Sequence, residues 1–420
     1  MHHFHYQNGE LYCENAPVDR IARKVGTPFY LYSHATLSHH YRVFDAAFAG
    51  FSHIICFAVK ANANLAVLSL FAGLGGGADI VSGGELYRAL QAGVDPQKIV
   101  YSGVGKKPEE IKFALKSGIL LFNLESSQEL GEINRIAGRL GVKAPVALRI
   151  NPDIDPQTHP YISTGLKKNK FGIHIERAIQ DYRHAQELPH LEVKGAACHI
   201  GSQITELGPF IDALKRLKKL INRLDKEGIP IQYLDLGGGL GIRYDQEEPP
   251  HPSEYGEALI KELKGLKCTL ILEPGRVLVG NAGILVTRVL YTKEGEGKHF
   301  IIVDAGMNDL ARPSLYGSYH ALRPVVERPR PQVKASLVGP ICESGDFLAK
   351  DRKMPAFQPG ELVAVMSAGA YGFSMSSNYN ARPRVAEILV KDDEFYVIRK
   401  RETYRQLIWG ERIPDILKGA

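Results

Sequence analysis

The chain has 420 residues, of which 44 % are hydrophobic, so it can bury a large core and is expected to form two domains. Its formal net charge of +6 is small for this length, and the basic residues are scattered or lie on helix faces. Neither a nucleic acid nor a membrane surface is therefore indicated as a partner, whereas anionic small-molecule substrates are compatible with this charge.

The five cysteines are widely spaced, odd in number and form no C-x-x-C pair. This spacing argues against a disulfide framework and against a structural zinc site, so no metal is expected and a reducing compartment fits best. The N-terminus has no apolar stretch of signal-peptide length, and no run approaches a membrane span. We therefore expect a cytoplasmic protein.

The first predicted elements are a short strand at Pro28 to Tyr32 and a helix that continues to Ala49. From His53 the chain repeats one pattern, in which a short apolar run is followed by a turn and an amphipathic segment. Eight of these runs are typical of strands: Ile54 to Val59, Ala78 to Val81, Ile99 to Tyr101, Ile119 to Asn123, Val146 to Ile150, Val193 to His199, Ile231 to Leu236 and Thr269 to Leu272. Eight strands alternating with helices predict a (β/α)8 TIM-like barrel, with a doubly wound open sheet as the structural alternative.

After Gly275 the chain becomes rich in valine, isoleucine and aromatic residues, with glycine and proline between the apolar runs and little helical periodicity. The predicted strands are Val277 to Leu290, His299 to Val303, Val333 to Val338, Glu361 to Met366, Arg384 to Val390 and Glu394 to Ile398. These runs predict a separate β domain. We place the barrel at residues 27–276 and form the β domain from residues 1–26 and 277–420.

A single lysine, Lys60, follows the first apolar run of the barrel, in Phe57-Ala58-Val59-Lys60-Ala61-Asn62. Taken alone, it is best interpreted as a side chain that snorkels past the rim of the strand. The functional alternative is a desolvated amine whose lowered pKa lets it form a Schiff base with a carbonyl cofactor or substrate.

Further polar groups occur at the carboxyl ends of the predicted strands, where the functional groups of a barrel gather. They are Asp79, Arg149, His199, the triple glycine Gly237-Gly238-Gly239 and the run Glu273-Pro274-Gly275-Arg276. Each has a structural interpretation as a core histidine, a tight turn or a strand terminus. The glycines can equally present backbone N–H groups to a phosphate, whereas they do not match the dinucleotide fingerprint.

Together these groups match the chemical requirements of a single cofactor. An amine that forms an imine, a site for one phosphate and a carboxylate that keeps a pyridine nitrogen protonated are what pyridoxal phosphate requires. A protonated ring is a strong electron sink, so the carboxylate Glu273 favours decarboxylation.

The chain resembles the fold type III pyridoxal-phosphate-dependent decarboxylases over almost its whole length, from Gly26-Thr27-Pro28 to Tyr379-Asn380. The motifs that carry the resemblance are Phe57 to Asn62, Thr158 to Gly165 with Lys170-Phe171-Gly172, His199 to Ser202, Gly237 to Gly239, Glu273 to Arg276, Arg312 to Tyr316 and Cys342 to Asp346. The resemblance implies an alanine racemase-like architecture, a barrel followed by a β-sandwich or β-barrel domain, and pyridoxal 5'-phosphate as the cofactor.

By resemblance, Lys60 is the Schiff-base lysine, Glu273 pairs with the pyridine nitrogen and His199 stacks on the ring. The residues implied around the phosphate or its neighbourhood are Ser202, Gly237, Gly238, Gly239, Gly275, Arg276 and Tyr371. Asp79 and Arg149 match positions that line the cofactor pocket.

The resemblance also assigns roles in the C-terminal domain. Cys342 matches a proton donor that reaches into the neighbouring subunit's site, and a thiol suits this task because thiols exchange protons near neutral pH. Residues implied in substrate binding are Arg276, Arg312, Tyr316, Glu343 and Tyr371. The arginines and Tyr316 would hold a distal carboxylate, and Glu343 would take a distal ammonium. The implied reaction is decarboxylation of meso-2,6-diaminopimelate at its D centre to L-lysine, the final step of lysine biosynthesis, by a homodimer with shared active sites.

Three alternatives stay open from the sequence. Related decarboxylases act on other amino acids or on carrier-bound acyl groups with much of the same machinery. An amino-acid racemase would place an arginine against the pyridine nitrogen, and Glu273 speaks against it. A non-catalytic pyridoxal-phosphate carrier would lack the second domain, whereas this chain has a long β domain that carries Cys342 and Arg312.

Overall fold

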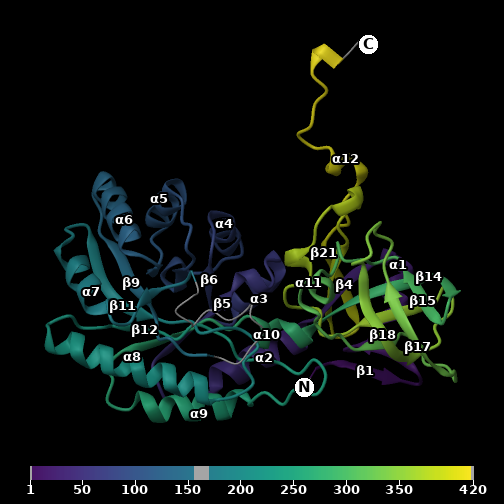
Figure 1. Cartoon of the computed structure of the whole chain (residues 1–420), viewed down its shortest axis with the longest axis horizontal. Coiled ribbons are helices and arrows are strands. Elements are labelled where there is room, and N and C mark those ends of the chain that lie inside the picture. The colour runs from purple at the N-terminus through teal and green to yellow at the C-terminus, as the bar shows by residue number, and fades with distance from the viewer. Residues whose placement is uncertain (1, 156–169, 418–420) are drawn as a thin grey trace. The chain divides into compact units, whose positions relative to one another are not determined.

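The computed structural model describes residues 2–155 and 170–417, and the motif at residues 158–165 therefore lies outside the described part of the chain. Two compact units make up the chain (Figure 1). The barrel unit comprises Ala35–Ala282 and Gly369–Ser374, and the β unit comprises Met1–His34, Gly283–Ala368 and Met375–Ala420.

In the described residues of the barrel unit, eight parallel strands form a closed ring. They are β5 (His53–Ala58), β6 (Gly77–Ile80), β7 (Ile99–Tyr101), β8 (Leu121–Leu124), β9 (Ala144–Asn151), β11 (Leu191–Ala197), β12 (Tyr233–Asp235) and β13 (Thr269–Leu272). The ring closes because β8 pairs with β9 as well as with β7, and β13 pairs with β5. This closure confirms the predicted barrel and excludes the open sheet. A short strand, β10 (Ile173–His174), adds to β9.

The strand sequences are apolar because the barrel strands are covered on both faces. Every residue of β6, β7 and β8 is buried, as parallel strands between a core and a helix layer require. The helices that alternate with the strands are α2 (His34–Ala46), α3 (Leu65–Gly73), α4 (Gly83–Gln91), α5 (Pro108–Ser117), α6 (Ser127–Leu140), α7 (Ala178–Glu187), α8 (Gly208–Lys226) and α9 (Pro252–Leu263).

Short loops join the carboxyl ends of the early strands to these helices. Asn64, Ser82 and Ser126 each begin a helix by accepting a hydrogen bond from a backbone N–H of its first turn. Because these caps lie two to six residues after the strand ends, the polar groups at those ends are held on well-defined backbone.

The β unit is a mixed sheet in the order β18-β17-β15-β14-β4-β20-β21, with β19 on β14 and β16 on β19. Its strands are β4 (Phe29–Ser33), β14 (Gly283–Gly295), β15 (Lys298–Val303), β16 (Leu322–Pro324), β17 (Gln332–Val338), β18 (Phe347–Pro355), β19 (Leu362–Val365), β20 (Ala386–Lys391) and β21 (Glu394–Arg399). A small sheet of β1 (Phe4–Gln7), β2 (Glu10–Cys13) and β3 (Ala16–Pro17) is followed by α1 (Val18–Val25).

The strands predicted for this unit omit β1, β2, β3, β16 and β18, and the start of β14 was placed too early. The run from Val277 begins with α10 (Arg276–Val279), so β14 starts only at Gly283. Strand β18 was missed because its centre, Lys350 to Lys353, is charged, which is typical of a strand at the end of a sheet. Among the described helices of both units, none combines the length and the hydropathy that a membrane crossing needs.

Candidate active site

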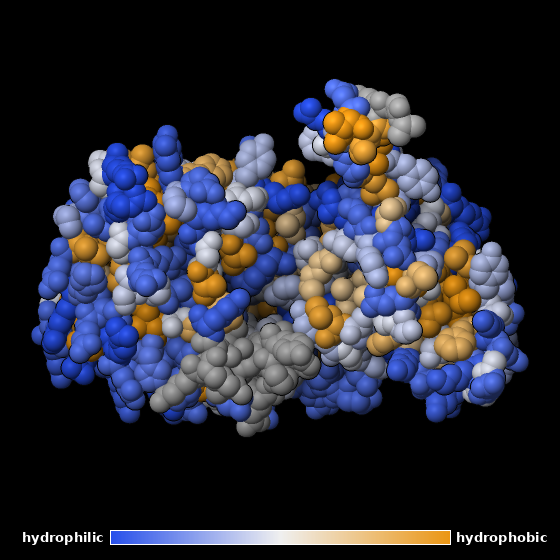
Figure 2. All heavy atoms as spheres, turned by 45° about the horizontal axis from the view of Figure 1, so that its top comes forward, coloured by the Kyte–Doolittle hydropathy of each residue, from blue (hydrophilic) through white to orange (hydrophobic). Residues whose placement is uncertain are grey.

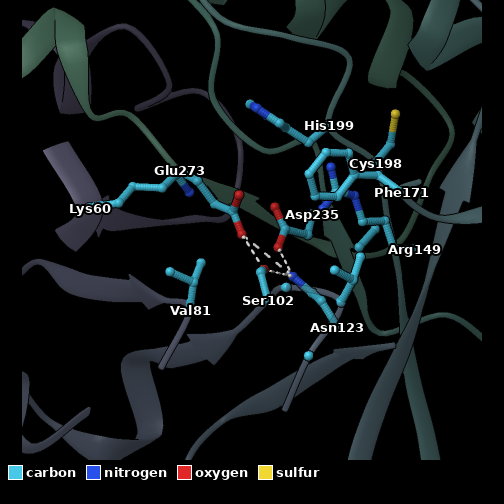
Figure 3. A pocket seen from close by; sticks show the side chains of 14 residues that line it. Lys60, Val81, Ser102, Asn123, Arg149, Phe171, Cys198, His199, Asp235 and Glu273 are labelled. Atoms are coloured by element: carbon cyan, nitrogen blue, oxygen red, sulfur yellow. Dashed lines mark hydrogen bonds between the residues drawn. The ribbon is translucent and has the colours of Figure 1, made fainter. Parts of the chain in front are cut away.

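A cavity of about 410 Å³ lies at the carboxyl ends of the barrel strands, a size that suits a small-molecule site. It is lined by Lys60, Val81, Ser102, Gly103, Val104, Gly105, Asn123, Arg149, Phe171, Ala197, Cys198, His199, Asp235 and Glu273. Figure 3 shows the side chains that converge there. Four residues selected from the sequence, Lys60, Arg149, His199 and Glu273, thus share one cavity.

Lys60 lies in a short 3-10 turn (Val59–Ala61) that follows β5 directly. Its Nζ is 2.5 Å from Oδ2 of Asp79 on the neighbouring strand β6, and Asp79 is fully buried whereas about a third of the lysine side chain is open. Burial by itself lowers the pKa of Lys60, but the charges of Asp79 and Glu273, the nearby Tyr371 and the hydrogen bond to Asp79 outweigh burial and raise it. The lowered pKa expected from the sequence is therefore wrong for this structure, in which the amine is a paired cation.

Two carboxyl groups, those of Asp235 and Glu273, lie near each other in the cavity (Figure 3). Asp235 ends β12 and Glu273 follows β13, and the amide of Asn123 donates to both, over 2.7 Å to Asp235 Oδ2 and 3.4 Å to Glu273 Oε1. The hydroxyl of Ser102 also donates to Glu273 Oε1, over 3.3 Å. Burial raises the pKa of Asp235 to about 6. Burial, together with the charges of Asp235 and Asp79, holds the pKa of Glu273 well above its usual range, so Glu273 binds a proton more strongly than an exposed glutamate does.

Replacing Glu273 by glutamine should stabilise the folded chain increasingly as the pH rises. Folded Glu273 has a raised pKa, so the stability it contributes is complete below the ordinary value of 4.5 and is lost as the pH rises towards the folded pKa. Glutamine resembles the neutral carboxyl group and binds no proton. The difference in unfolding free energy between variant and parent should therefore grow by up to about 1.4 kcal/mol per pH unit. Urea unfolding of ligand-free protein between about pH 5 and pH 8 measures it, and a constant difference would contradict the raised pKa.

His199 follows β11 and is held by the glycine turn. The N–H of Gly238 donates to its Nδ1 over 3.2 Å, which places the ring proton on Nε2. Burial, and then the charges of Arg149 and Lys60, lower the pKa of His199 well below its usual range. His199 is therefore a neutral imidazole that lines the cavity.

The triple glycine is required by close packing. Gly237 has φ +66° and donates its N–H to Asp235 Oδ1 over 2.8 Å, and Gly239 has φ +122°. A Cβ on Gly238 would lie only 2.1 Å from the carbonyl oxygen of Glu273. The turn consequently sets the positions of Asp235, His199 and Glu273 relative to one another, and the N–H groups of Gly237 and Gly238 are already engaged by side chains.

A second polar cluster surrounds the buried Arg276 at the start of α10. Its Nη2 donates to Ser202 Oγ over 3.0 Å and its Nη1 donates to the Tyr244 hydroxyl over 2.7 Å. The guanidinium carbon lies 4.9 Å from the centre of the Tyr371 ring, a cation–π distance. The predicted residues Ser202, Arg276 and Tyr371 are thus brought together.

Tyr371 reaches this cluster from a strained backbone position. Its φ is +55°, a left-handed conformation that costs an aromatic residue about 1–3 kcal/mol. Its N–H donates to the carbonyl oxygen of Ala61, next to Lys60, over 2.8 Å. A Cβ on Gly275 would lie 3.1 Å from the Cβ atoms of Ala58 and Ala61, so glycine allows these segments to approach.

Arg149, on β9, is fixed from two sides. Its Nη1 donates to Glu125 Oε1 over 2.7 Å, and its guanidinium lies 4.9 Å from the centre of the Phe171 ring. Glu125 also accepts from the backbone N–H groups of Gly103 and Gly172, over 3.2 and 2.8 Å. The arginine is therefore a rigid positive charge in the cavity wall.

The remaining predicted residues belong to the β unit. Arg312 begins α11 (Arg312–Tyr316), is buried, and donates to Ser318 Oγ over 3.2 Å. Cys342 and Glu343 lie on an exposed loop that Asp346 anchors, because its carboxylate accepts from the N–H of Ile341 over 2.6 Å. Arg312, Tyr316, Cys342 and Glu343 are therefore in a different unit from Lys60.

Sequence reasoning missed four residues that organise the cavity. Ser102 follows β7, Asn123 lies within β8, Glu125 follows β8, and Asp235 ends β12. Their signal was visible, since each is polar and lies at the carboxyl end of an apolar run. The sequence alone assigns no role to these side chains, because their partners come from other strands.

Residues 34–280 match the family described as pyridoxal-dependent decarboxylase, pyridoxal binding domain. The chain belongs to the pyridoxal-dependent decarboxylases. Its full-length relatives carry a narrower name: the diaminopimelate decarboxylases of Pseudomonas aeruginosa and Vibrio cholerae are each 54 % identical to it, over 98 % and 97 % of this chain and 99 % and 98 % of theirs. The solved structure of diaminopimelate decarboxylase from Helicobacter pylori complexed with L-lysine is 45 % identical, with a TM-score of 0.90 over 93 % of this chain and 98 % of that one.

The cavity fits the cofactor of this family. Lys60 is the lysine among the cavity-lining residues, and Glu273 lies on the same cavity with a carboxyl group suited to a ring nitrogen. The carboxylate Oδ1 of Asp79 is buried without a hydrogen-bond partner in the described structure, next to the oxygen that pairs with Lys60 Nζ. Arg276 with Ser202 supplies cationic and hydroxyl donors for a phosphate.

Proposed function

We propose that this chain is a pyridoxal 5'-phosphate-dependent decarboxylase that converts meso-2,6-diaminopimelate into L-lysine and CO2, the final step of lysine biosynthesis. The observation that carries the proposal is the shared cavity of Lys60 and Glu273 in a chain that is 54 % identical to named diaminopimelate decarboxylases over nearly its whole length. We also propose that it acts in the cytoplasm, which its five free cysteines support.

In this proposal the barrel unit holds the cofactor. Lys60 would bind the aldehyde carbon, and the neutral imidazole of His199 would lie against the ring face. Arg276, Ser202 and Tyr371 would hold the phosphate, with Gly275 and the turn of Gly237, Gly238 and Gly239 leaving room beside them. Asp79 and Arg149 would position Lys60 and the cavity wall. When bound, pyridoxal phosphate supplies an electron sink for the negative charge that develops at the substrate α-carbon.

Glu273 would keep the proton at the ring nitrogen. Burial beside Asp235 and Asp79 raises the pKa of its carboxyl group well above the usual range, so the group binds a proton more strongly than an exposed glutamate does. A basic nitrogen placed against it can take that proton, and the resulting ion pair is stabilised by the low dielectric of the cavity floor. Asn123 and Ser102 orient the carboxyl group for this purpose.

The β unit would supply the substrate end and the proton donor. Arg312 and Tyr316, with Arg276, would bind the distal carboxylate, and Glu343 would bind the distal ammonium, with Tyr371 nearby. Cys342, exposed on its loop, would protonate the α-carbon in the site of a second copy, which makes the protein a homodimer with shared sites. The exposure of both Cys342 and Glu343 supports this assignment.

Replacing Arg312 by methionine should raise the KM for diaminopimelate by roughly 10²-fold, because a charge-assisted contact to the distal carboxylate is lost. The kcat should fall much less, since Arg312 does not touch the reacting carbon. Steady-state kinetics separate the two constants, and Arg323→Met serves as the control because Arg323 is an exposed arginine of the same unit. An unchanged KM would contradict the assignment of Arg312.

The proposed function is tested by incubating the purified protein and pyridoxal phosphate with meso-diaminopimelate, L-lysine, L-ornithine and L-alanine in parallel. We expect CO2 and L-lysine in equal amounts from diaminopimelate alone. A single-turnover reaction that yields neither product would remove the proposal. Racemisation of alanine without CO2 would instead indicate a racemase.

A further inference from the structure

The C-terminal segment, residues 403–417, exposes an unusual amount of apolar surface. It follows β21 and contains α12 (Tyr404–Leu407) and a final 3-10 turn (Asp415–Leu417). Its exposed large apolar residues are Tyr404, Ile408, Trp409, Ile413, Ile416 and Leu417, and Trp409 and Ile416 are 88 % and 90 % exposed. Figure 1 shows this segment running away from the sheet of its own unit, and Figure 2 shows its apolar surface. Apolar surface of this extent marks an interaction site.

The segment has a defined backbone although its side chains face solvent. Thr403 caps α12, the N–H of Trp409 donates to the Gln406 carbonyl, and the N–H of Leu417 donates to the Pro414 carbonyl. Gly410, at φ +91°, separates the two turns. The apolar side chains are thus held on a backbone of defined conformation.

The charge of the segment argues against a membrane as its partner. Residues 403–417 contain two basic residues, Arg405 and Arg412, and two acidic residues, Glu411 and Asp415, so the segment has no net charge. Segments that bind membrane surfaces are typically basic, continuous amphipathic helices. A segment without net charge that consists of short turns is better suited to binding a protein surface.

The barrel unit offers a complementary apolar surface. Of the large apolar residues exposed in its described part, two lie in the loops after β6 and β7, one begins α3 and one lies in α4, whereas the fifth, Val142, follows α6. The four are Leu65, Val81, Tyr87 and Val104, and we call them the mouth patch because Val81 and Val104 also line the cavity. The C-terminal segment of one copy could therefore bury its apolar side chains against the mouth patch of another copy.

We propose that residues 403–417 form an arm that packs on the mouth patch of a second copy of this chain. In a symmetric pair each copy gives one arm and receives one, so the contact occurs twice. The inference deepens the proposed function, on whose shared site it rests, because it says how the second copy is held at the cavity mouth.

The test uses the holoenzyme and its only tryptophan, Trp409, which lies on the arm. On dilution through the dimer dissociation range, measured by analytical ultracentrifugation, we expect the Trp409 emission to move to longer wavelength as the arm is released. A variant that ends at Glu402 keeps the hydrogen bonds from Arg384 and Asn378 to Glu402. This variant should dimerise at least about 100-fold more weakly. A symmetric dimer loses both arm contacts at once, one from each copy, and each contact contains aromatic and aliphatic side chains.

A matched pair of point variants examines the receiving surface. Tyr87→Asp changes the mouth patch and should raise the dimer dissociation constant about tenfold or more. Tyr291→Asp is the control, since Tyr291 is a similarly exposed tyrosine, 67 % against 59 %, on β14 of the other unit. It should leave the dissociation constant unchanged. These variants keep the arm and its tryptophan, and so they decide the question even where the shortened chain fails to fold.

Three results would overturn the inference. The shortened chain could dimerise as tightly as the full chain. The Trp409 emission could lie at short wavelength at every concentration, which would mean that the arm packs on its own chain. The emission could respond only to neutral lipid vesicles. Because sedimentation needs no substrate, failure of the arm is distinguished from failure of the decarboxylase proposal, which only the diaminopimelate assay reports.

Discussion

Replacing Lys60 by alanine should abolish the yellow absorbance of bound pyridoxal phosphate and reduce decarboxylation by roughly 10⁴- to 10⁶-fold, the scale expected when a covalently acting residue is removed. The physical reason is that Lys60 is the lysine that lines the cavity, so its amine is the group that can bind an aldehyde there. Its partner at 2.5 Å, Asp79, is a fully buried carboxylate and cannot replace it. Absorbance spectra and CO2 release from diaminopimelate measure the two losses.

The control is Lys112→Ala, because Lys112 is an exposed lysine on α5 of the same unit and should behave as the parent protein does. In the parent, borohydride should attach the reduced cofactor to the peptide that contains Lys60. A variant that stays yellow and still reacts with borohydride would show that another residue anchors the cofactor.

Replacing Cys342 by alanine should lower kcat by roughly 10²- to 10⁴-fold, the contribution of a positioned general acid. Since Cys342 is exposed on a loop of the β unit, the proposed acceptor site lies on a second copy. Mixing inactive Lys60→Ala and Cys342→Ala homodimers should therefore restore activity. Heterodimers have one site with both residues intact, so an equal mixture should recover about a quarter of the parent activity.

The mixing experiment would show no recovered activity if the sites were not shared between subunits. If both residues served the same chain's site, every heterodimer site would carry one defect and no activity would return. Subunit exchange is established separately with two affinity tags. Full exchange without recovery would place Cys342 and Lys60 in one chain's site.

The barrel could be predicted from the sequence because its signal is local. Eight apolar runs with helical segments between them specify strands that are buried on both faces, and each of the predicted runs overlaps a barrel strand. The β unit was harder, because the charged centre of β18 lacks the apolar composition of the other strands. The short helix α10 before β14 has the opposite effect, since its sequence is as rich in valine and leucine as a strand.

The site could be predicted only as a set of chemical groups. Lys60 and Glu273 were found because, taken together with the other polar groups at the strand ends, an amine and a carboxylate match what pyridoxal phosphate requires. The raised pKa of Lys60 could not be foreseen, since it depends on Asp79 lying on the adjacent strand. Likewise Asn123 becomes meaningful only once the register brings it between Asp235 and Glu273.

The central position of β4 has a consequence for how the protein is made. Its five residues are all buried between β14 and β20, strands that begin at Gly283 and Ala386. During synthesis β4 leaves the ribosome before the barrel, whereas β14 and β20 are made after it. The apolar residues of β4 therefore stay exposed and prone to aggregation until these two strands have been synthesised. We expect nascent chains that stop before β20 to require chaperones, and the barrel to become resistant to proteases earlier than the N-terminal residues that precede it.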